Sequence, residues 1–203
     1  NIGNPGYGGI IPKGLAGYDG SIGFEYNPKK AKALVLEYKK QSNNEIPNLK
    51  ISTTENYLSF CEFIQRALQD IGLLIEIDVM PASALKSAKA NGKTTVFRAS
   101  WVADYPDAQN YLSLFYSENF APNGPNYTHF KNEKFDRIYK SAMKETNDSI
   151  RTVLYKKMDK IIMSEAPVVI LFYDEALRFV HKSIEGLEIN PTNLLEIKRV
   201  RKY

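Results

Sequence analysis

An amphipathic run between two short apolar stretches is the feature that most constrains how this chain folds. Residues 56–71 carry apolar side chains at helical spacing, namely Tyr57, Phe60, Cys61, Ile64, Ala67, Leu68 and Ile71. This spacing predicts a helix with one buried face, and Gly72 is suited to end it. Residues 49–53 before the helix and 73–80 after it favour strands. The stretch therefore predicts strand, helix and strand in succession.

The same alternation continues along the chain. Asn27, Asn132 and Asp148 are each predicted to cap the start of a further helix. A weaker helix is expected at 81–90. Further strands are predicted at residues 94–101, 168–172 (buried) and 195–200, with a ribbon at 179–181 and 187–189. The predicted fold class is α/β, a mixed α+β sheet with flanking helices.

Composition narrows the possible classes of protein. With 203 residues, 43% apolar and 25% charged, the chain matches one ordinary globular domain or two small ones. Its longest apolar run, 168–173, is far short of the roughly 20 residues that cross a bilayer. The net charge of +4 is spread over the chain, which does not favour a nucleic-acid partner. The single cysteine, Cys61, is predicted to be a buried core thiol.

Few residues suggest catalysis or a cofactor. The two histidines, His129 and His181, have no carboxylate or thiol at ligand spacing, so no metal and no other cofactor is expected. Asp104 and Asp107 are a possible acid–base pair for glycoside chemistry. The alternatives are that Asp107 caps a short helix while Asp104 bonds loop amides, or that Asp104 binds a ligand. These alternatives stay open at this point.

The predicted strand 94–101 leads into a distinctive segment, Trp-Val-Ala-Asp-Tyr-Pro-Asp, at 101–107. In a regular strand Trp101 shares one face with Phe97 and Ala99, while Arg98 faces the other side. An arginine on a half-buried strand requires an acceptor. Asp104 falls on the side of Arg98, opposite Trp101, unless the chain twists or bulges.

Five segments together resemble a known family. In chain order they are IPKGLAGYD at 11–19, FEYNPKKAKAL at 24–34, IQRALQDIGL at 64–73, WVADYPD at 101–107 and NEKFD at 132–136. They are similar to the C-terminal half of the extracytoplasmic solute-binding proteins of ABC transporters, in the dipeptide and oligopeptide class. The resemblance extends over about residues 10–190.

The resemblance implies an architecture and a function. Residues 1–181 are expected to form the second lobe of a two-lobed, type II-like periplasmic binding protein, with 1–26 as an extended arm. Residues 182–203 are expected to return to the first lobe, which lies outside this chain. The whole protein is expected to capture peptides in an interlobe cleft and deliver them to a membrane permease, without catalysis. Its expected location is periplasmic or otherwise extracytoplasmic, either free or anchored by lipid.

The resemblance also implies a binding site. Asp104 stands where peptide-binding relatives receive the amino terminus of the ligand, and Val102 stands where backbone pairs with the peptide. Trp101 is expected to form one wall of a side-chain pocket. Tyr105, in the same segment, is a further candidate binding residue. Arg98 matches a position that meets the peptide carboxylate in some relatives, although a salt bridge within the lobe is an equal alternative. The candidates for the rim of the site are Asn126 and Tyr127.

Three other functions remain as alternatives. The same fold is compatible with a nickel complex, haem or an oligosaccharide as ligand, because fold does not fix function. An enzyme that uses Asp104 and Asp107 predicts turnover that either single substitution abolishes. A basic nucleic-acid module predicts affinity that falls steeply with salt.

Overall fold

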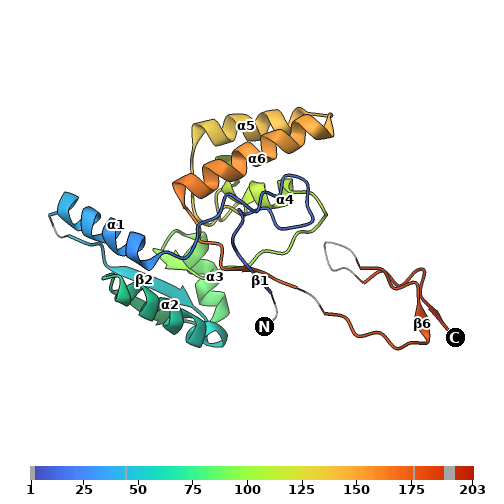
Figure 1. The fold of residues 1–203 in the computed structure, drawn as a ribbon, viewed down its shortest axis with the longest axis horizontal. Helices are drawn as coiled ribbons and strands as arrows, with labels where there is room; N and C mark the ends of the chain where they lie inside the picture. Colours follow the sequence, from blue (N-terminus) through green and yellow to red (C-terminus); the bar gives the residue numbers. More distant parts are fainter. Residues whose placement is uncertain (1–2, 44, 176, 190–194) are drawn as a thin grey trace. The chain divides into compact units, whose positions relative to one another are not determined.

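The computed structural model describes residues 3–43, 45–175, 177–189 and 195–203 (Figure 1). The chain forms two compact units, each made of segments that are separated in the sequence. Unit 1 comprises residues 1–24, 101–119 and 130–203, and unit 2 comprises residues 25–100 and 120–129.

Unit 2 is built on a parallel sheet with the strand order β3-β2-β4. Its strands are β2 (Leu49–Thr53), β3 (Ile75–Val79) and β4 (Val96–Phe97). β2 pairs with β3 along its full length but with β4 only at Ile51 and Ser52. β2 therefore has its predicted bounds and is the central strand.

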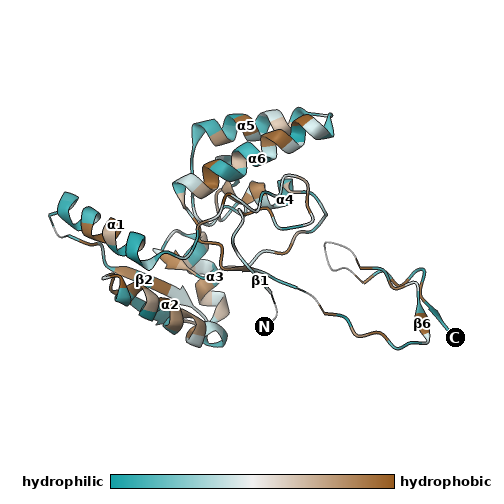
Figure 2. Cartoon of the chain, viewed as in Figure 1, coloured by the Kyte–Doolittle hydropathy of each residue, from teal (hydrophilic) through white to brown (hydrophobic). Residues whose placement is uncertain are grey.

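Four helical segments accompany this sheet. They are α1 (Pro28–Gln41), the 3-10 turn η1 (Glu55–Tyr57), α2 (Leu58–Asp70) and α3 (Ala82–Ala90). The side chain of Asn27 accepts the backbone N–H of Lys30, which confirms the predicted cap of α1. Cys61 on α2 is fully buried against Ile51 and Ile75, as predicted for a core thiol. Figure 2 shows brown, hydrophobic segments in this sheet and α2, whereas α1 is largely teal.

A glycine ends α2 in the way the sequence predicts. Gly72 has a φ of +90°, in the left-handed region. Its N–H donates to the carbonyl of Gln69 at 2.9 Å, and the N–H of Leu73 donates to that of Leu68 at 3.0 Å. These two bonds form a Schellman motif, which turns the chain toward β3.

Unit 1 contains most of the remaining helix. Its helical segments are α4 (Gln109–Leu112), η2 (Ser113–Phe115), η3 (Ser117–Asn119), α5 (Glu133–Lys144) and α6 (Asp148–Glu165). The long helices α5 and α6 lie side by side (Figure 1). Asn132 caps α5 as predicted, but Asn147 rather than Asp148 caps α6, through the N–H groups of Ser149 and Ile150. In the described ranges no helix has the length and apolar character needed to cross a membrane.

An arm at the start of the chain packs onto α6 within unit 1. The buried carboxylate of Asp159 accepts the N–H of Ile10 at 2.8 Å and that of Ile11 at 3.4 Å. A Cβ at Gly9 would lie 2.1 Å from Asp159 Oδ1, so any larger residue there would clash. Ile11 is fully buried in the main core of unit 1, which it shares with side chains from α4, α5 and α6.

Several predicted strands are wrong in place or extent. The strand predicted at 94–101 is limited to β4. The run at 168–172 is not a buried strand: β5 (Phe172–Tyr173) pairs with β1 (Asn4–Pro5), and Val169 is 79% exposed. In place of the ribbon and the strand at 195–200, β6 (Ile184–Glu185) pairs with β7 (Arg201–Lys202). The mixed α/β class is nevertheless confirmed.

Candidate functional site

The loop at 101–107 in unit 1 is held by the short helix that follows it. The indole Nε1–H of Trp101 donates to Asn110 Oδ1 across 2.6 Å, and Asn110 is itself buried. Ala103 is also buried, and its backbone is hydrogen-bonded to the Tyr111 hydroxyl. Burial raises the pKa of Tyr111, and the bond to Ala103 opposes that rise. The loop backbone is therefore supported at two points although it is neither helix nor strand.

A third support runs from Tyr105 into the core. The hydroxyl of Tyr105 donates to Gln109 Oε1, and Gln109 Nε2–H donates to the Tyr139 hydroxyl at 2.6 Å. The ring of Tyr139 stacks on Tyr116, with centroids 4.5 Å apart. Burial raises the pKa of Tyr139, so this phenol stays neutral. Tyr105 is thereby oriented even though 45% of its surface is exposed.

Asp104 differs from Asp107 on this loop because no described residue pairs with its carboxylate. Its side chain is exposed, and among the described residues it takes part in no hydrogen bond or ion pair. Its neighbour Val102 is also exposed, at 70%, whereas Ala103 between them is buried. A carboxylate on a supported backbone is a strong acceptor for an ammonium or guanidinium group. The loop can therefore bind a cationic group.

Asp107 has a different role from Asp104. Its Oδ1 accepts the N–H of Gln109 at 2.8 Å, and its Oδ2 lies 3.6 Å from Nη2 of Arg151. The nearby Asp107 carboxylate adds to burial in raising the pKa of Tyr155. The cap residue of α4 is Ala108 and not Asp107, so the predicted cap is wrong by one position, although the Asp107 side chain accepts the N–H of the first helical residue, Gln109. The alternative in which Asp104 bonds loop amides is not observed in the described part of the loop.

Unit 2 contains a hollow of about 210 Å³, which we call the cationic hollow. Thr53 and Thr54 line it at the carboxyl end of β2, and Ser100 lines it just after β4. Carboxyl ends of parallel strands are the usual place for ligand sites in open α/β sheets. The charged groups in its lining are Lys86, Lys89 and Arg98, and no acidic side chain is among its described lining residues.

Arg98 in this hollow is positioned by an aromatic ring. Its guanidinium carbon lies 3.5 Å from the centroid of the Tyr57 ring, a cation–π contact. Its Nη1–H donates to Ser100 Oγ at 3.4 Å. The described residues give Arg98 no ion pair, so the predicted intralobe salt bridge is not observed there. Tyr57, predicted as a core residue of the helix, is instead 37% exposed.

Lys89 is a member of the site that sequence reasoning missed. Its Nζ lies 5.3 Å from the ring centroids of both Phe97 and Tyr127. Burial, and after it the charge of Arg98, lowers the pKa of Lys89. The available signal was the spacing of Lys86 and Lys89, which are three residues apart and share one face of α3.

The loop at 120–129 belongs to unit 2 and holds the two predicted rim residues. Asn126 is fully buried, where its Oδ1 accepts the Thr128 hydroxyl at 3.0 Å and its carbonyl accepts the N–H of Ala121 at 3.2 Å. Asn126 therefore shapes the loop from inside and does not lie at a surface rim. Tyr127 is half-buried, and its ring contacts Lys89, which lines the cationic hollow.

The predicted site residues are divided between the two units. Unit 1 contains Trp101, Val102, Asp104 and Tyr105, and unit 2 contains Arg98, Asn126 and Tyr127. Within unit 1 the structure gathers its members on one supported loop. Within unit 2 it gathers Arg98 and Tyr127 around Lys89 but not Asn126.

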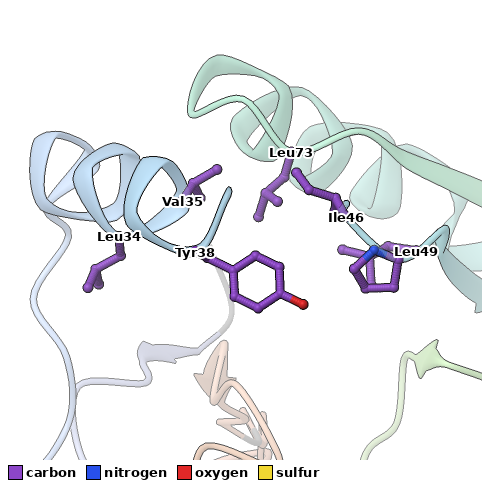
Figure 3. A pocket seen from close by; sticks show the side chains of 7 residues that line it. Leu34, Val35, Tyr38, Ile46, Leu49 and Leu73 are labelled. Atoms are coloured by element: carbon purple, nitrogen blue, oxygen red, sulfur yellow. The ribbon is translucent and has the colours of Figure 1, made fainter. Parts of the chain in front are cut away.

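Unit 2 also carries an apolar pocket of about 300 Å³ (Figure 3). Figure 3 shows the Tyr38 ring extending from α1 into this space. The other residues that line it are Leu34, Val35, Ile46, Pro47, Leu49 and Leu73. None of these lining side chains is charged, and the Tyr38 hydroxyl is the polar side-chain group among them.

Comparison with known proteins adds independent findings. Residues 1–123 match the model of the bacterial extracellular solute-binding proteins, family 5 Middle. The chain is 26% identical to the di/tripeptide-binding protein 2 of Pseudomonas aeruginosa, over 95% of this chain and 37% of that protein. The chain spans about 36% of the length of the curated relatives it matches.

Two solved structures resemble the fold. The periplasmic binding protein DppA from Helicobacter pylori, in complex with the peptide STSA, aligns with a TM-score of 0.66 and 28% identity. That alignment covers 83% of this chain and 34% of DppA. The dipeptide-binding protein from Pseudoalteromonas sp. SM9913, in complex with Met-Leu, aligns with a TM-score of 0.77 and 20% identity. It covers all of this chain, 100%, and 41% of that protein, and it shows likeness of fold.

Proposed function

This chain belongs to the bacterial extracellular solute-binding proteins of family 5, and from that premise we propose that its whole protein captures peptides for an ABC importer. The protein binds its ligand outside the cytoplasm and passes it to a membrane permease. It has no catalytic step. Residues 1–181 belong to the second of two lobes, and residues 182–203 return toward the first. Closure of the two lobes about a hinge is the working motion.

The observation that carries the proposal is the Asp104 carboxylate, which stands on a supported loop and has no partner among the described residues. A peptide presents an ammonium group at its amino terminus, which is the partner that such a carboxylate binds best. Because the hydrogen bonds of Trp101 and Tyr105 already orient the loop, little ordering entropy is lost when a ligand binds.

The other predicted site residues have complementary roles. The exposed Val102 offers its backbone to an extended peptide in the manner of strand addition. Trp101 is 37% exposed, so part of its ring remains available to wall a side-chain pocket. In unit 2, Arg98 offers a guanidinium to the anionic end of a peptide, because its contact with Tyr57 uses the ring face and leaves N–H donors available.

The relatives support a peptide as the class of ligand. The Pseudomonas aeruginosa relative is described as a di/tripeptide-binding protein, and the Helicobacter pylori structure contains a peptide. A nickel complex, haem or an oligosaccharide has no ammonium group to occupy the Asp104 carboxylate, which makes these ligands weaker candidates.

Native mass spectrometry of the whole protein, purified without added ligand, tests the class of ligand directly. We expect released masses that correspond to a mixture of small peptides. A single sugar, haem or metal-complex mass would overturn the peptide assignment while leaving the family unchanged. If the purified protein releases no ligand, calorimetric titration with di- to pentapeptides is the next measurement. Failure of every peptide to bind would contradict the proposal.

Asp104→Asn tests the proposed contact with the amino terminus. A charge-assisted hydrogen bond contributes about 1.5–3 kcal/mol, so affinity for peptides with a free amino terminus should fall roughly 10- to 100-fold. For the same peptides after N-acetylation, wild type and Asp104→Asn should have equal affinities. Asp70→Asn, which removes an exposed carboxylate at the end of α2, is the matched control. Equal affinities of wild type and Asp104→Asn for free peptides would exclude this role.

A further inference from the structure

The cationic hollow concentrates more positive charge than one carboxylate can neutralise. Lys86, Lys89 and Arg98 all line it, and no acidic side chain does so among the described residues. Within the described chain none of the three forms an ion pair. Burial, and after it repulsion by the charge of Arg98, lowers the pKa of Lys89.

Aromatic rings, rather than acids, hold two of these cations in place. Arg98 lies over the face of Tyr57, and Lys89 lies near the faces of Phe97 and Tyr127. A cation–π contact orients a cation through the ring face and uses none of its N–H groups as donors to an acceptor atom. The donors of Lys89 and most of those of Arg98 therefore remain available to an incoming anion.

The backbone around the hollow favours an anion as well. Ala82, the first residue of α3, lines the hollow, and α3 has no side-chain cap at its start. The free N–H groups of a first helical turn and the helix dipole both favour negative charge. The side chains of Thr53 and Thr54 add hydroxyl groups at the end of β2.

The size of the hollow limits what it can bind. Its volume of about 210 Å³ is below the roughly 300–1,000 Å³ that is usual for sites enclosing a whole small ligand. It is therefore suited to one residue-sized group and not to an entire drug-sized molecule. An acidic side chain together with a terminal carboxylate combines this size with two negative charges.

We propose that the cationic hollow selects peptides whose last residue is Asp or Glu, with Lys86 and Lys89 binding the second carboxylate. This inference rests on the proposed peptide-binding function and names a subclass of its ligands. Arg98 faces the terminal carboxylate, and the two lysines of α3 discriminate between an acidic side chain and its neutral amide.

The test compares two tripeptides, Ala-Ala-Glu and Ala-Ala-Gln, by calorimetric titration of the whole protein. We expect Ala-Ala-Glu to bind roughly 10- to 100-fold more tightly at moderate ionic strength, as for a charge-assisted contact. Lys89→Gln should remove most of that preference, because it should lower the affinity for Ala-Ala-Glu more than the affinity for Ala-Ala-Gln. Lys89→Arg should retain it, and Lys93→Gln, which alters an exposed lysine just after α3, should leave it unchanged.

The outcomes separate the inference from the function on which it rests. Equal binding of the two tripeptides, or a preference for Ala-Ala-Glu that survives in Lys89→Gln, overturns the inference and leaves peptide binding intact. Binding of neither tripeptide nor of any other peptide overturns both. Inorganic phosphate that binds in a Lys89-dependent manner, without any preference for Ala-Ala-Glu, overturns the dicarboxylate assignment. A far-UV circular dichroism spectrum and a thermal melt that match the wild type serve as the check that Lys89→Gln is folded.

Discussion

Asp159 is fully buried beneath the N-terminal arm, where it accepts the N–H groups of Ile10 and Ile11. Burial raises the pKa of its carboxyl from 3.8 to about 6, although the two hydrogen bonds act in the opposite direction. Between these pH values the native protein holds a proton that the unfolded chain has released. The contribution of Asp159 to the free energy of unfolding is therefore largest at low pH and falls as pH rises toward 6.

Asp159→Asn should remove this pH dependence. One proton corresponds to about 1.4 kcal/mol per pH unit, or roughly 3 kcal/mol between the two pKa values. The variant has one acceptor oxygen for two N–H groups, which adds a loss of stability that does not vary with pH. Urea denaturation from pH 4 to 7 at constant ionic strength measures the slope. Asp70→Asn should keep the wild-type slope, and an unchanged slope in Asp159→Asn would refute the assignment.

At the scale of single elements, helix caps control where α5 begins. Asn132 Oδ1 accepts the N–H groups of Lys134 and Phe135, each at 3.0 Å. Asn132→Ala leaves both donors without this partner and should cost about 1 kcal/mol, which corresponds to about 2–4 °C in Tm. Asn123→Ala, at an exposed loop position, is the matched control and should be close to neutral. Equal shifts for the two variants in a thermal melt would contradict the capping role.

Elements whose ends depend on local chemistry were predicted well from the sequence. The cap at Asn27 and the left-handed Gly72 each act through neighbours a few residues away. The start of α1 and the end of α2 therefore follow from the local sequence alone. The bond from the Gln109 N–H to Asp107 is also local, although the cap residue of α4 is Ala108, one position beyond the predicted cap.

Strands were predicted less well because their extent depends on a distant partner. The alternation at 94–101 is compatible with a long strand, but β2 pairs with only Val96 and Phe97. Of the apolar run at 168–172, only Phe172 pairs with β1, followed by Tyr173 just beyond the run. The cationic hollow was missed for the same reason, since Tyr57, Lys89 and Arg98 meet only after the sheet has formed.

For the whole molecule, the division into two units could not be predicted from composition. The boundary falls between Ser100 and Trp101, inside what the sequence predicts as one strand, and residues 120–129 return to unit 2. The crossing between Ser100 and Trp101 does not coincide with a linker rich in glycine or proline, whereas the return at 120–129 contains Pro122, Gly124 and Pro125. Each unit nevertheless has its own core, centred on Ile162 and its neighbours in unit 1 and on Ile51 and its neighbours in unit 2.

Two separate cores predict local rather than uniform loss of stability. Ile162 is fully buried and Ile51 is 4% exposed, so truncation of either to alanine should cost about 2–5 kcal/mol. Amide hydrogen exchange should show Ile162→Ala lowering protection mainly in α5 and α6, and Ile51→Ala lowering it mainly in α2, β2 and β3. Ile150→Ala, at a position on α6 that is 50% exposed, controls for side-chain size alone and should change little. If either core variant lowered protection equally in both units, the chain would unfold as one cooperative body, and the division into two units would describe its geometry but not its energetics.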